Sequence, residues 1–118
     1  MGGTFSSRIK DNERVDDDSV EGAILSNCVV MFSTTTCKFC EKAKLSLANL
    51  GVRYKVIELD LLGKNSFIYS KELSLKTGVR TVPQIFVNGQ FVGGYSEMEQ
   101  LKEAGKLIEM VYQCAYQN

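Results

Sequence analysis

Histidine is absent from this chain of 118 residues. Its absence excludes nucleophilic sites built on a Cys–His or Ser–His pair, and it excludes most zinc sites. No apolar run approaches the roughly 20 residues of a membrane-spanning helix. Neither sign of charge is in excess, because 14 basic residues balance 14 acidic ones. This balance does not favour binding to nucleic acid or to another polyanion.

Cysteine is scarce, with four residues in all, of which only Cys37 and Cys40 are close in sequence. The chain is therefore not a dense disulfide scaffold. Residues 1–20 lack the apolar segment of a secretory signal, so we expect a reducing intracellular compartment. A C-x-x-C pair in that setting is more often catalytic than structural. With 44% hydrophobic and 24% charged residues, the chain suits a single soluble domain.

The first 18 residues are polar, and we expect a flexible tail at 1–18 ahead of one domain at 19–118. This tail has three basic and five acidic residues, whereas mitochondrial transit peptides are Arg-rich and poor in acids. We therefore expect a cytoplasmic or nuclear location. The start of the chain also fits the N-myristoylation pattern at Gly2, with an unmodified tail as the alternative. A single acyl chain would give only weak, reversible membrane binding.

A strand–helix–strand unit is predicted for the first half of the domain. Ser19 can cap a short helix over 20–25. The run 28–32 is continuously apolar, as in a strand covered on both faces, and 54–59 is a second strand. Between them a helix over 39–50 should bury Ala43, Leu47 and Leu50. Two strands linked by one helix imply a right-handed parallel crossover.

The second half is predicted to form a helix over 66–76, a hairpin and two further helices. Asn88-Gly89 between β-branched and aromatic runs is a strong hairpin signal. Ser96 and Glu99 have the spacing of a capping box, which predicts a helix from Ser96 to about residue 104. A last helix should cover 106–114. The class is α/β, with a four-stranded mixed sheet flanked by helices on both faces.

Cys37 and Cys40 lie where the first strand hands over to a helix. At that place, unpaired backbone N–H groups and the helix dipole stabilise an anion, and the ammonium of Lys38 adds to the effect. The thiolate is the attacking form of cysteine. This favours a thiol–disulfide redox motif with Cys37 as nucleophile. The alternatives are a pair of small core residues or half of a metal site.

Three separated motifs together resemble the glutaredoxin family over about residues 20–114. They are Cys37-Lys38-Phe39-Cys40, then Thr81-Val82-Pro83 before the third strand, and Gly93-Gly94 after the fourth. Thioredoxins carry a Trp just before their motif, and this chain has none. The resemblance implies a thioredoxin-like fold and a glutathione-disulfide oxidoreductase. Such an enzyme reduces protein–glutathione mixed disulfides and other protein disulfides, and acts as a monomer.

The resemblance also implies roles for individual residues. Cys37 would attack the mixed disulfide and become glutathionylated, and Cys40 would resolve it in dithiol reactions. A cis peptide bond is expected before Pro83, with the backbone of Val82 pairing with glutathione. The helix after Gly94 would hold the γ-glutamyl carboxylate. The expected glutathione contacts are Lys38, Phe39, Arg80, Thr81, Val82, Pro83, Gly94, Ser96 and Glu97.

The chain departs from the family at two positions near the expected glutathione site. Thr34 replaces a lysine that commonly binds the glycyl carboxylate of glutathione. Arg80 matches a cationic position of the family, so we expect it to carry more of that binding, with a plain surface charge as the alternative. Lys38 is a second substitute cation. Glu97 stands where relatives usually have Asp, so its contact with the ligand's ammonium need not be direct.

Cys28 and Cys114 resemble a second cysteine pair found in the glutaredoxin-2 type of animals, and a structural disulfide is implied. Ordinary core packing is the alternative. Two rival functions also stay open. One is a dimer bridged by a [2Fe–2S] cluster, with Cys37 and glutathione as ligands, since Lys38 replaces the proline that disfavours a cluster in this family. The other is a non-catalytic adaptor of the same fold.

Overall fold

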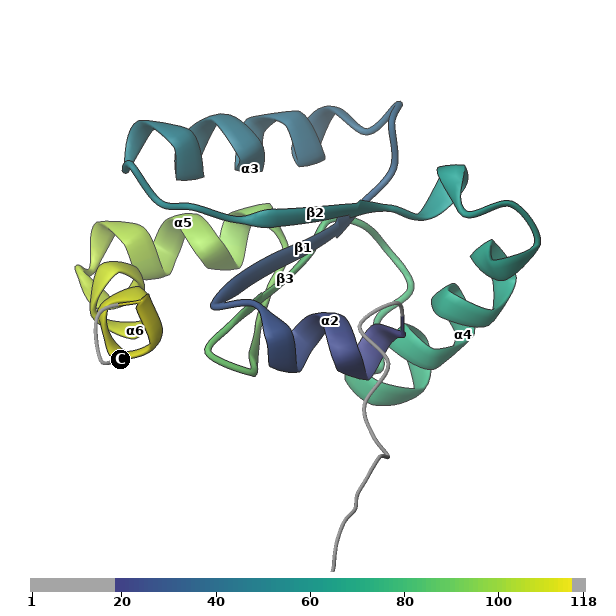
Figure 1. Cartoon of the computed structure of the whole chain (residues 1–118). Helices are drawn as coiled ribbons and strands as arrows, with labels where there is room; N and C mark the ends of the chain where they lie inside the picture. The colour runs from purple at the N-terminus through teal and green to yellow at the C-terminus, as the bar shows by residue number, and fades with distance from the viewer. Residues whose placement is uncertain (1–18, 116–118) are drawn as a thin grey trace, which may run out of the picture.

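Strand β1 (Val29–Ser33) lies inside a four-stranded sheet with the order β2-β1-β3-β4. The computed structural model describes residues 19–115, and Figure 1 shows their arrangement. β1 pairs in parallel with β2 (Lys55–Glu58) and antiparallel with β3 (Gln84–Val87). β3 pairs antiparallel with β4 (Gln90–Gly93). The predicted mixed sheet and its parallel crossover are confirmed.

Helices cover both faces of the sheet, as predicted. One face packs against α3, α5 and α6, and the other against α2 and α4. The three helices of the first face are α3 (Lys38–Asn49), α5 (Tyr95–Glu103) and α6 (Lys106–Ala115). The second face has α2 (Val20–Ser26) and α4 (Ser66–Thr77). Two short 3-10 turns, η1 (Leu59–Leu61) and η2 (Gly63–Asn65), join β2 to α4.

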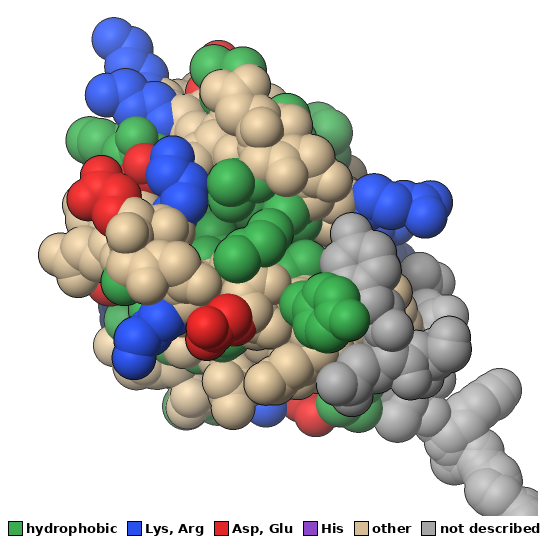
Figure 2. All heavy atoms as spheres, turned by 90° about the vertical axis from the view of Figure 1, so that its left-hand side faces the viewer, with side chains coloured by type: hydrophobic (Ala, Val, Ile, Leu, Met, Phe, Trp, Pro, Cys, Tyr) green, Lys and Arg blue, Asp and Glu red, His purple; other side chains and the backbone are tan. Residues whose placement is uncertain are grey.

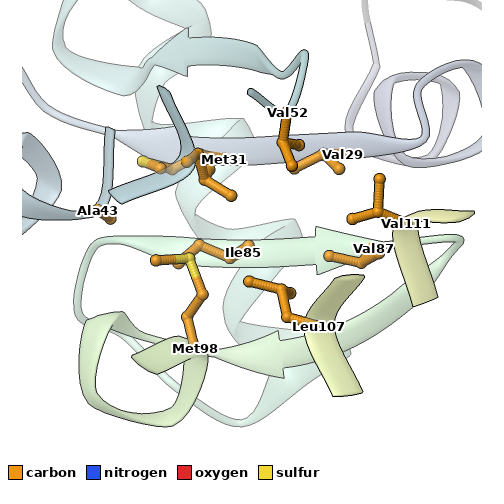
Figure 3. Packing of buried hydrophobic residues seen from close by; sticks show 10 residues of the cluster. Val29, Met31, Ala43, Val52, Ile85, Val87, Met98, Leu107 and Val111 are labelled. Atoms are coloured by element: carbon orange, nitrogen blue, oxygen red, sulfur yellow. The ribbon is translucent and has the colours of Figure 1, made fainter. Parts of the chain in front are cut away.

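The central strands contribute to two separate cores because their side chains alternate. Val29 and Met31 of β1 join the core under α3, α5 and α6, which Figure 3 shows together with Ile85 and Val87 of β3. Val30 and Phe32 point to the opposite face and pack near α2 and α4. Both faces of β1 are fully buried, which is why its first four residues, Val29 to Phe32, are all apolar.

Two local predictions have mixed outcomes. The hairpin is confirmed, since Asn88 and Gly89 join β3 to β4 with φ values of 52° and 79°, as the tight two-residue turn requires. Leu50 was expected in the core but is exposed, because α3 ends at Asn49 and Leu50 lies at its C-cap. Ala43 and Leu47 are buried as predicted.

The predicted capping box at Ser96 and Glu99 is wrong. α5 begins at Tyr95 and Gly94 is its N-cap, so the capping carboxylate comes from Glu97, three residues after Gly94. Glu99 instead points to α3, where the hydroxyl of Ser46 donates to it and Lys102 pairs with it at 2.9 Å. Glycine has no side chain that could mark it as an N-cap in the sequence, so the sequence pattern favoured the nearby Ser96 as the start of the helix.

The two ends of the molecule differ. The N-terminus of α3, with Cys37, lies at the right of Figure 1. The left-hand end carries α6 and the C-terminus of α3, and apolar side chains gather at its centre among charged ones (Figure 2). In the part of the chain that the structure describes, no helix is long and apolar enough to cross a bilayer. The predicted tail at 1–18 and the acylation at Gly2 lie outside the described residues.

Candidate active site

Cys37 lies at the N-terminus of α3, immediately after the turn that follows β1. It is the N-cap residue, and the backbone N–H of Cys40 donates to its Sγ at 3.0 Å. Cys37 is half-buried and Cys40 is fully buried. The two are joined as a disulfide, with their Cα atoms 5.1 Å apart. A sulfur that accepts a backbone N–H at a helix start is placed where a thiolate is stabilised.

The loop before β3 closes over this sulfur. The peptide bond between Val82 and Pro83 is cis, and the carbonyl oxygen of Val82 lies 3.7 Å from Cys37 Sγ. Pro83 is buried, Val82 is half-buried and Thr81 is exposed. The antiparallel pairing of β1 with β3 brings these residues beside Cys37, although they follow it by more than 40 positions.

Gln84 holds this loop in place, which we did not predict. Its side chain is buried, and its amide nitrogen donates to the carbonyl oxygens of Val79 at 2.9 Å and Thr81 at 3.1 Å. The hydroxyl of Thr77 donates to the amide oxygen of Gln84 at 3.0 Å. One buried amide therefore connects the end of α4 to the cis-proline loop. The available signal was a polar residue opening an otherwise apolar strand.

A groove of about 340 Å³ runs beside the cis-proline loop and β4. It brings together four of the predicted residues, Thr81, Pro83, Gly94 and Glu97. Gly93 has φ +115°, and a Cβ there would lie 2.7 Å from Cβ of Glu97, so glycine is required. Glu97 Oε1 accepts a hydrogen bond of 2.9 Å from the N–H of Gly94. The residues that line the groove are Val79, Thr81, Pro83, Phe91, Val92, Gly93, Gly94 and Glu97.

Several exposed side chains lie close in sequence to Cys37 or to the residues that line the groove. Phe39 is 56% exposed, and its ring packs against that of Tyr95 with centroids 5.9 Å apart. The ammonium of Lys42 lies 5.3 Å from the centre of the Phe39 ring. The predicted contacts Lys38, Arg80 and Ser96 are all exposed. Tyr95 was not predicted, and its only signal was an aromatic residue directly after Gly93-Gly94.

Two further features lie apart from this site. A larger cavity, of about 1030 Å³, separates β2 from α4 and is lined by none of the predicted site residues. A second disulfide joins Cys28, just before β1, to Cys114 in α6, with Cα atoms 5.5 Å apart. This bond ties the two sequence ends of the domain together on the side away from Cys37.

Comparison with known proteins identifies the family. The glutaredoxin family model matches residues 29–92, which hold β1, β2, β3, most of β4 and the Cys37–Cys40 motif. The chain belongs to the glutaredoxin family. This glutaredoxin is 41% identical to bovine mitochondrial glutaredoxin-2 over 118 residues, or 100% of this chain and 74% of the relative. It is 40% identical to the human mitochondrial glutaredoxin-2 over 97% of this chain and 69% of the relative.

Solved structures agree with the fold of this glutaredoxin. A buckwheat glutaredoxin–glutathione complex superimposes with a TM-score of 0.75 at 36% identity, covering 78% of this chain and 83% of that one. A wheat glutaredoxin gives a TM-score of 0.75 at 34% identity, over 79% of this chain and 87% of that one. The thioredoxin-like fold is confirmed. The chain is an enzyme, a glutathione-dependent thiol oxidoreductase.

The expected cytoplasmic or nuclear location is wrong. The similar glutaredoxin-2 proteins from cattle, orangutan and human are mitochondrial. Our expectation rested on the average charge of residues 1–18, with five acids against three bases. An average over a segment does not describe the local pattern that a targeting receptor recognises, and for this chain it pointed to the wrong compartment.

Proposed function

We propose that this glutaredoxin reduces protein–glutathione mixed disulfides, with Cys37 as the nucleophile. The observation that supports this most is the position of Cys37 Sγ, which accepts the N–H of Cys40 at 3.0 Å at the start of α3. A thiolate there gains a hydrogen bond and the favourable end of the helix dipole. Its half-exposed position leaves the sulfur open to a substrate, whereas Cys40 is buried behind it.

The reaction needs two exchange steps and no added oxidant. The Cys37 thiolate attacks the glutathione sulfur of the mixed disulfide, a Cys37–glutathione disulfide forms, and the protein leaves as a thiolate. A second glutathione thiolate then attacks that sulfur, which releases glutathione disulfide and restores the Cys37 thiolate. In dithiol reactions the Cys40 thiolate instead attacks the Cys37 sulfur of a mixed disulfide, which closes the Cys37–Cys40 disulfide and releases the bound partner as a thiolate. The 5.1 Å between their Cα atoms suits that step.

Glutathione would bind in the groove between the cis-proline loop and the start of α5. The half-buried Val82 offers its backbone beside Cys37. Thr81, Pro83 and Gly94 line the neighbouring groove, with Glu97 at the helix start. The exposed residues Ser96 and Phe39 would contact the ligand, and the exposed cations Arg80 and Lys38 would attract the glycyl carboxylate. The bound tripeptide would add a short extended ladder to the loop.

Turnover of a glutathionylated peptide with free glutathione tests the proposal. Cys37→Ser should abolish turnover, whereas Cys40→Ser should keep deglutathionylation and lose reactions that need both thiols. Activity that survives Cys37→Ser would refute the assignment. Arg80→Ala should raise the KM for glutathione, and Arg53→Ala, an exposed arginine on the loop before β2, is the matched control. An unchanged KM in Arg80→Ala would leave Arg80 a plain surface charge.

A cluster-bridged dimer is a second candidate, supported by the half-exposed Cys37 beside Lys38 rather than a proline. Among residues 19–115, no three or more His, Cys, Asp or Glu side chains gather as metal ligands. One chain therefore cannot complete the four ligands of a [2Fe–2S] centre, so glutathione and a second copy would have to supply the rest. Size-exclusion chromatography after anaerobic reconstitution tests this. A glutathione-dependent coloured dimer supports it, and a colourless monomer contradicts it.

The relatives also suggest a cellular location for this chain. The glutaredoxin-2 proteins of cattle and human are mitochondrial, and we propose the same location for this chain. Subcellular fractionation of cells that express the full chain tests this, and recovery of the protein only in the cytosol would contradict it.

Acylation of Gly2 stays a prediction. Intact mass of protein purified from eukaryotic cells checks it, since a myristoyl group increases the mass of the N-terminal peptide.

A further inference from the structure

A carboxylate holds the turn that leads to Cys37. Asp60 lies in η1, just past the end of β2. Its two oxygens accept the backbone N–H of Thr35 at 3.1 and 3.3 Å, and one of them also accepts the Thr35 hydroxyl. Three hydrogen bonds from one residue to one carboxylate make a bidentate clasp, and hydrogen bonds to a charged acceptor are the stronger kind.

The clasp continues the register of the sheet. In the parallel pair of β1 and β2, Ser33 is the partner of Glu58, an offset of 25 positions. Thr35 and Asp60 are also 25 positions apart. Each therefore lies two residues beyond the last paired residue of its strand. The backbone pairing of β1 with β2 ends at Ser33 and Glu58. Beyond that point the Asp60 side chain, rather than a backbone carbonyl, binds the N–H of Thr35.

Thr35 is part of the turn whose last residue is the nucleophile. The N–H of Cys37 donates to the carbonyl of Thr34 at 3.4 Å, a long hydrogen bond that leaves the turn weakly closed on its own. The hydroxyl of Ser33 donates to the same carbonyl at 3.2 Å. A second tie joins α3 to the end of β2, since Lys44 pairs with Glu58 at 2.8 Å. The chain is thus tied to the end of β2 or to η1 on both sides of Cys37, through Thr35 before it and Lys44 after it.

We propose that Asp60 is a positioning residue for Cys37, acting through Thr35. By fixing the turn, it keeps Cys37 Sγ against the N–H groups at the start of α3. This inference rests on the proposed role of Cys37 as nucleophile. The charge of Asp60, which binds Thr35 two residues before Cys37, has the opposite effect, because a nearby anion disfavours a thiolate. Positioning and charge therefore predict changes of opposite sign when the clasp is broken.

The test is the pH dependence of Cys37 alkylation by iodoacetamide, followed by peptide mass spectrometry in a Cys40→Ser background. Thr35→Val removes the hydroxyl bond but leaves the charge of Asp60, and Asp60→Ala removes the whole clasp. Both should raise the pH midpoint of alkylation, Asp60→Ala by about half a unit, which lowers the thiolate fraction below the midpoint about threefold. Thr35→Ser keeps the hydroxyl and should restore the original midpoint.

A matched control and the contrary outcome complete the design. Glu21→Ala removes an exposed carboxylate of α2 that pairs with Lys76 of α4 and makes no contact with the turn before Cys37, and it should leave the midpoint unchanged. The double variant Asp60→Ala/Thr35→Val should be no worse than Asp60→Ala alone, because the two residues act through one contact. A midpoint that is unchanged or lower in Thr35→Val and Asp60→Ala overturns the inference. Alkylation needs no glutathione, so this result is independent of whether turnover is observed.

Discussion

Glu97 folds back over the N-terminus of its own helix, and its Oε1 accepts a 2.9 Å hydrogen bond from the backbone N–H of Gly94. The carboxylate thus occupies one of the unpaired donors at the start of α5. In the proposed glutathione site this end of α5 would receive the γ-glutamyl carboxylate. A side chain of the protein and a group of the ligand then compete for the same donors.

Glu97→Asp should therefore improve glutathione binding. The shorter side chain keeps the negative charge but reaches less far toward the Gly94 N–H, which leaves that donor to the ligand. We expect the KM for glutathione to fall about two- to five-fold, the size of one helix-terminus contact. Steady-state kinetics measure it. Glu103→Asp, at the exposed end of the same helix, is the control and should change nothing. A higher KM in Glu97→Asp would mean that the cap helps binding.

Replacement of Gln84 by leucine should loosen the cis-proline loop. Its amide bonds to Val79, Thr81 and Thr77 would be lost, and buried polar groups left without partners cost about 1–3 kcal/mol of unfolding free energy. Urea unfolding measures the loss. Because the loop carries Val82, turnover should fall as well. Gln90→Leu on β4 is the matched control, since Gln90 is exposed. Equal stability of the two variants would show that the Gln84 bonds are not structural.

Acid should weaken the contact between α3 and α5. The hydrogen bond from Ser46 and the ammonium of Lys102 lower the pKa of Glu99 below its ordinary value of 4.5. A carboxylate with a lowered pKa in the folded state stabilises the fold above its unfolded pKa, and this contribution is lost as pH falls through the folded value. The unfolding free energy should therefore drop below about pH 4.5. In Glu99→Gln the drop should be smaller, and an identical pH profile for both proteins would contradict the role of Glu99.

The disulfide between Cys28 and Cys114 should stabilise the domain. It closes a loop with a sequence separation of 86, and in the chain-entropy view a loop of that size contributes about 2–5 kcal/mol. Cys28→Ser/Cys114→Ser, made in a Cys40→Ser background, should lower the urea midpoint accordingly. Added reductant provides the internal control, because it should lower the Cys40→Ser protein to the same midpoint and leave the triple variant unmoved. A reductant effect on the triple variant would point to another cause.

Local patterns in the sequence were enough to predict most of the fold. A strand buried on both faces is apolar at nearly every position, so the run that contains Val29 to Phe32 could be recognised directly. Asn88-Gly89 predicted the hairpin because few residue pairs adopt positive φ at adjacent positions. Cys37 and Cys40 could also be predicted from a local pattern, because a strand end, a pair of thiols and a helix start follow one another in the sequence.

Contacts between distant segments could not be predicted in this way. Glu97 and Glu99 both fit a capping pattern, and only the pairing of Glu99 with Ser46, 53 positions away, separates their roles. Asp60 and Thr35 meet because two parallel strands end together, and the register of that pair is not encoded near either residue. Gln84 is a different case, because its partners Thr77, Val79 and Thr81 are only 7, 5 and 3 positions away, but no sequence pattern shows that its amide reaches them.

The link between Cys28 and Cys114 also determines how the chain responds to a pulling force. A tension applied through the two ends passes directly across the Cys28–Cys114 bond and bypasses the sheet. The intervening segment would extend to about 300 Å when stretched, but it carries no load while the bond is closed. Among the helices and strands that the structure describes, only α2, at Val20–Ser26, lies wholly outside this loop and can be drawn out first. An ATP-driven unfoldase that threads proteins through a narrow pore would therefore have to pass a cross-linked loop of chain when the Cys28–Cys114 disulfide is closed, and a single extended chain when it is reduced.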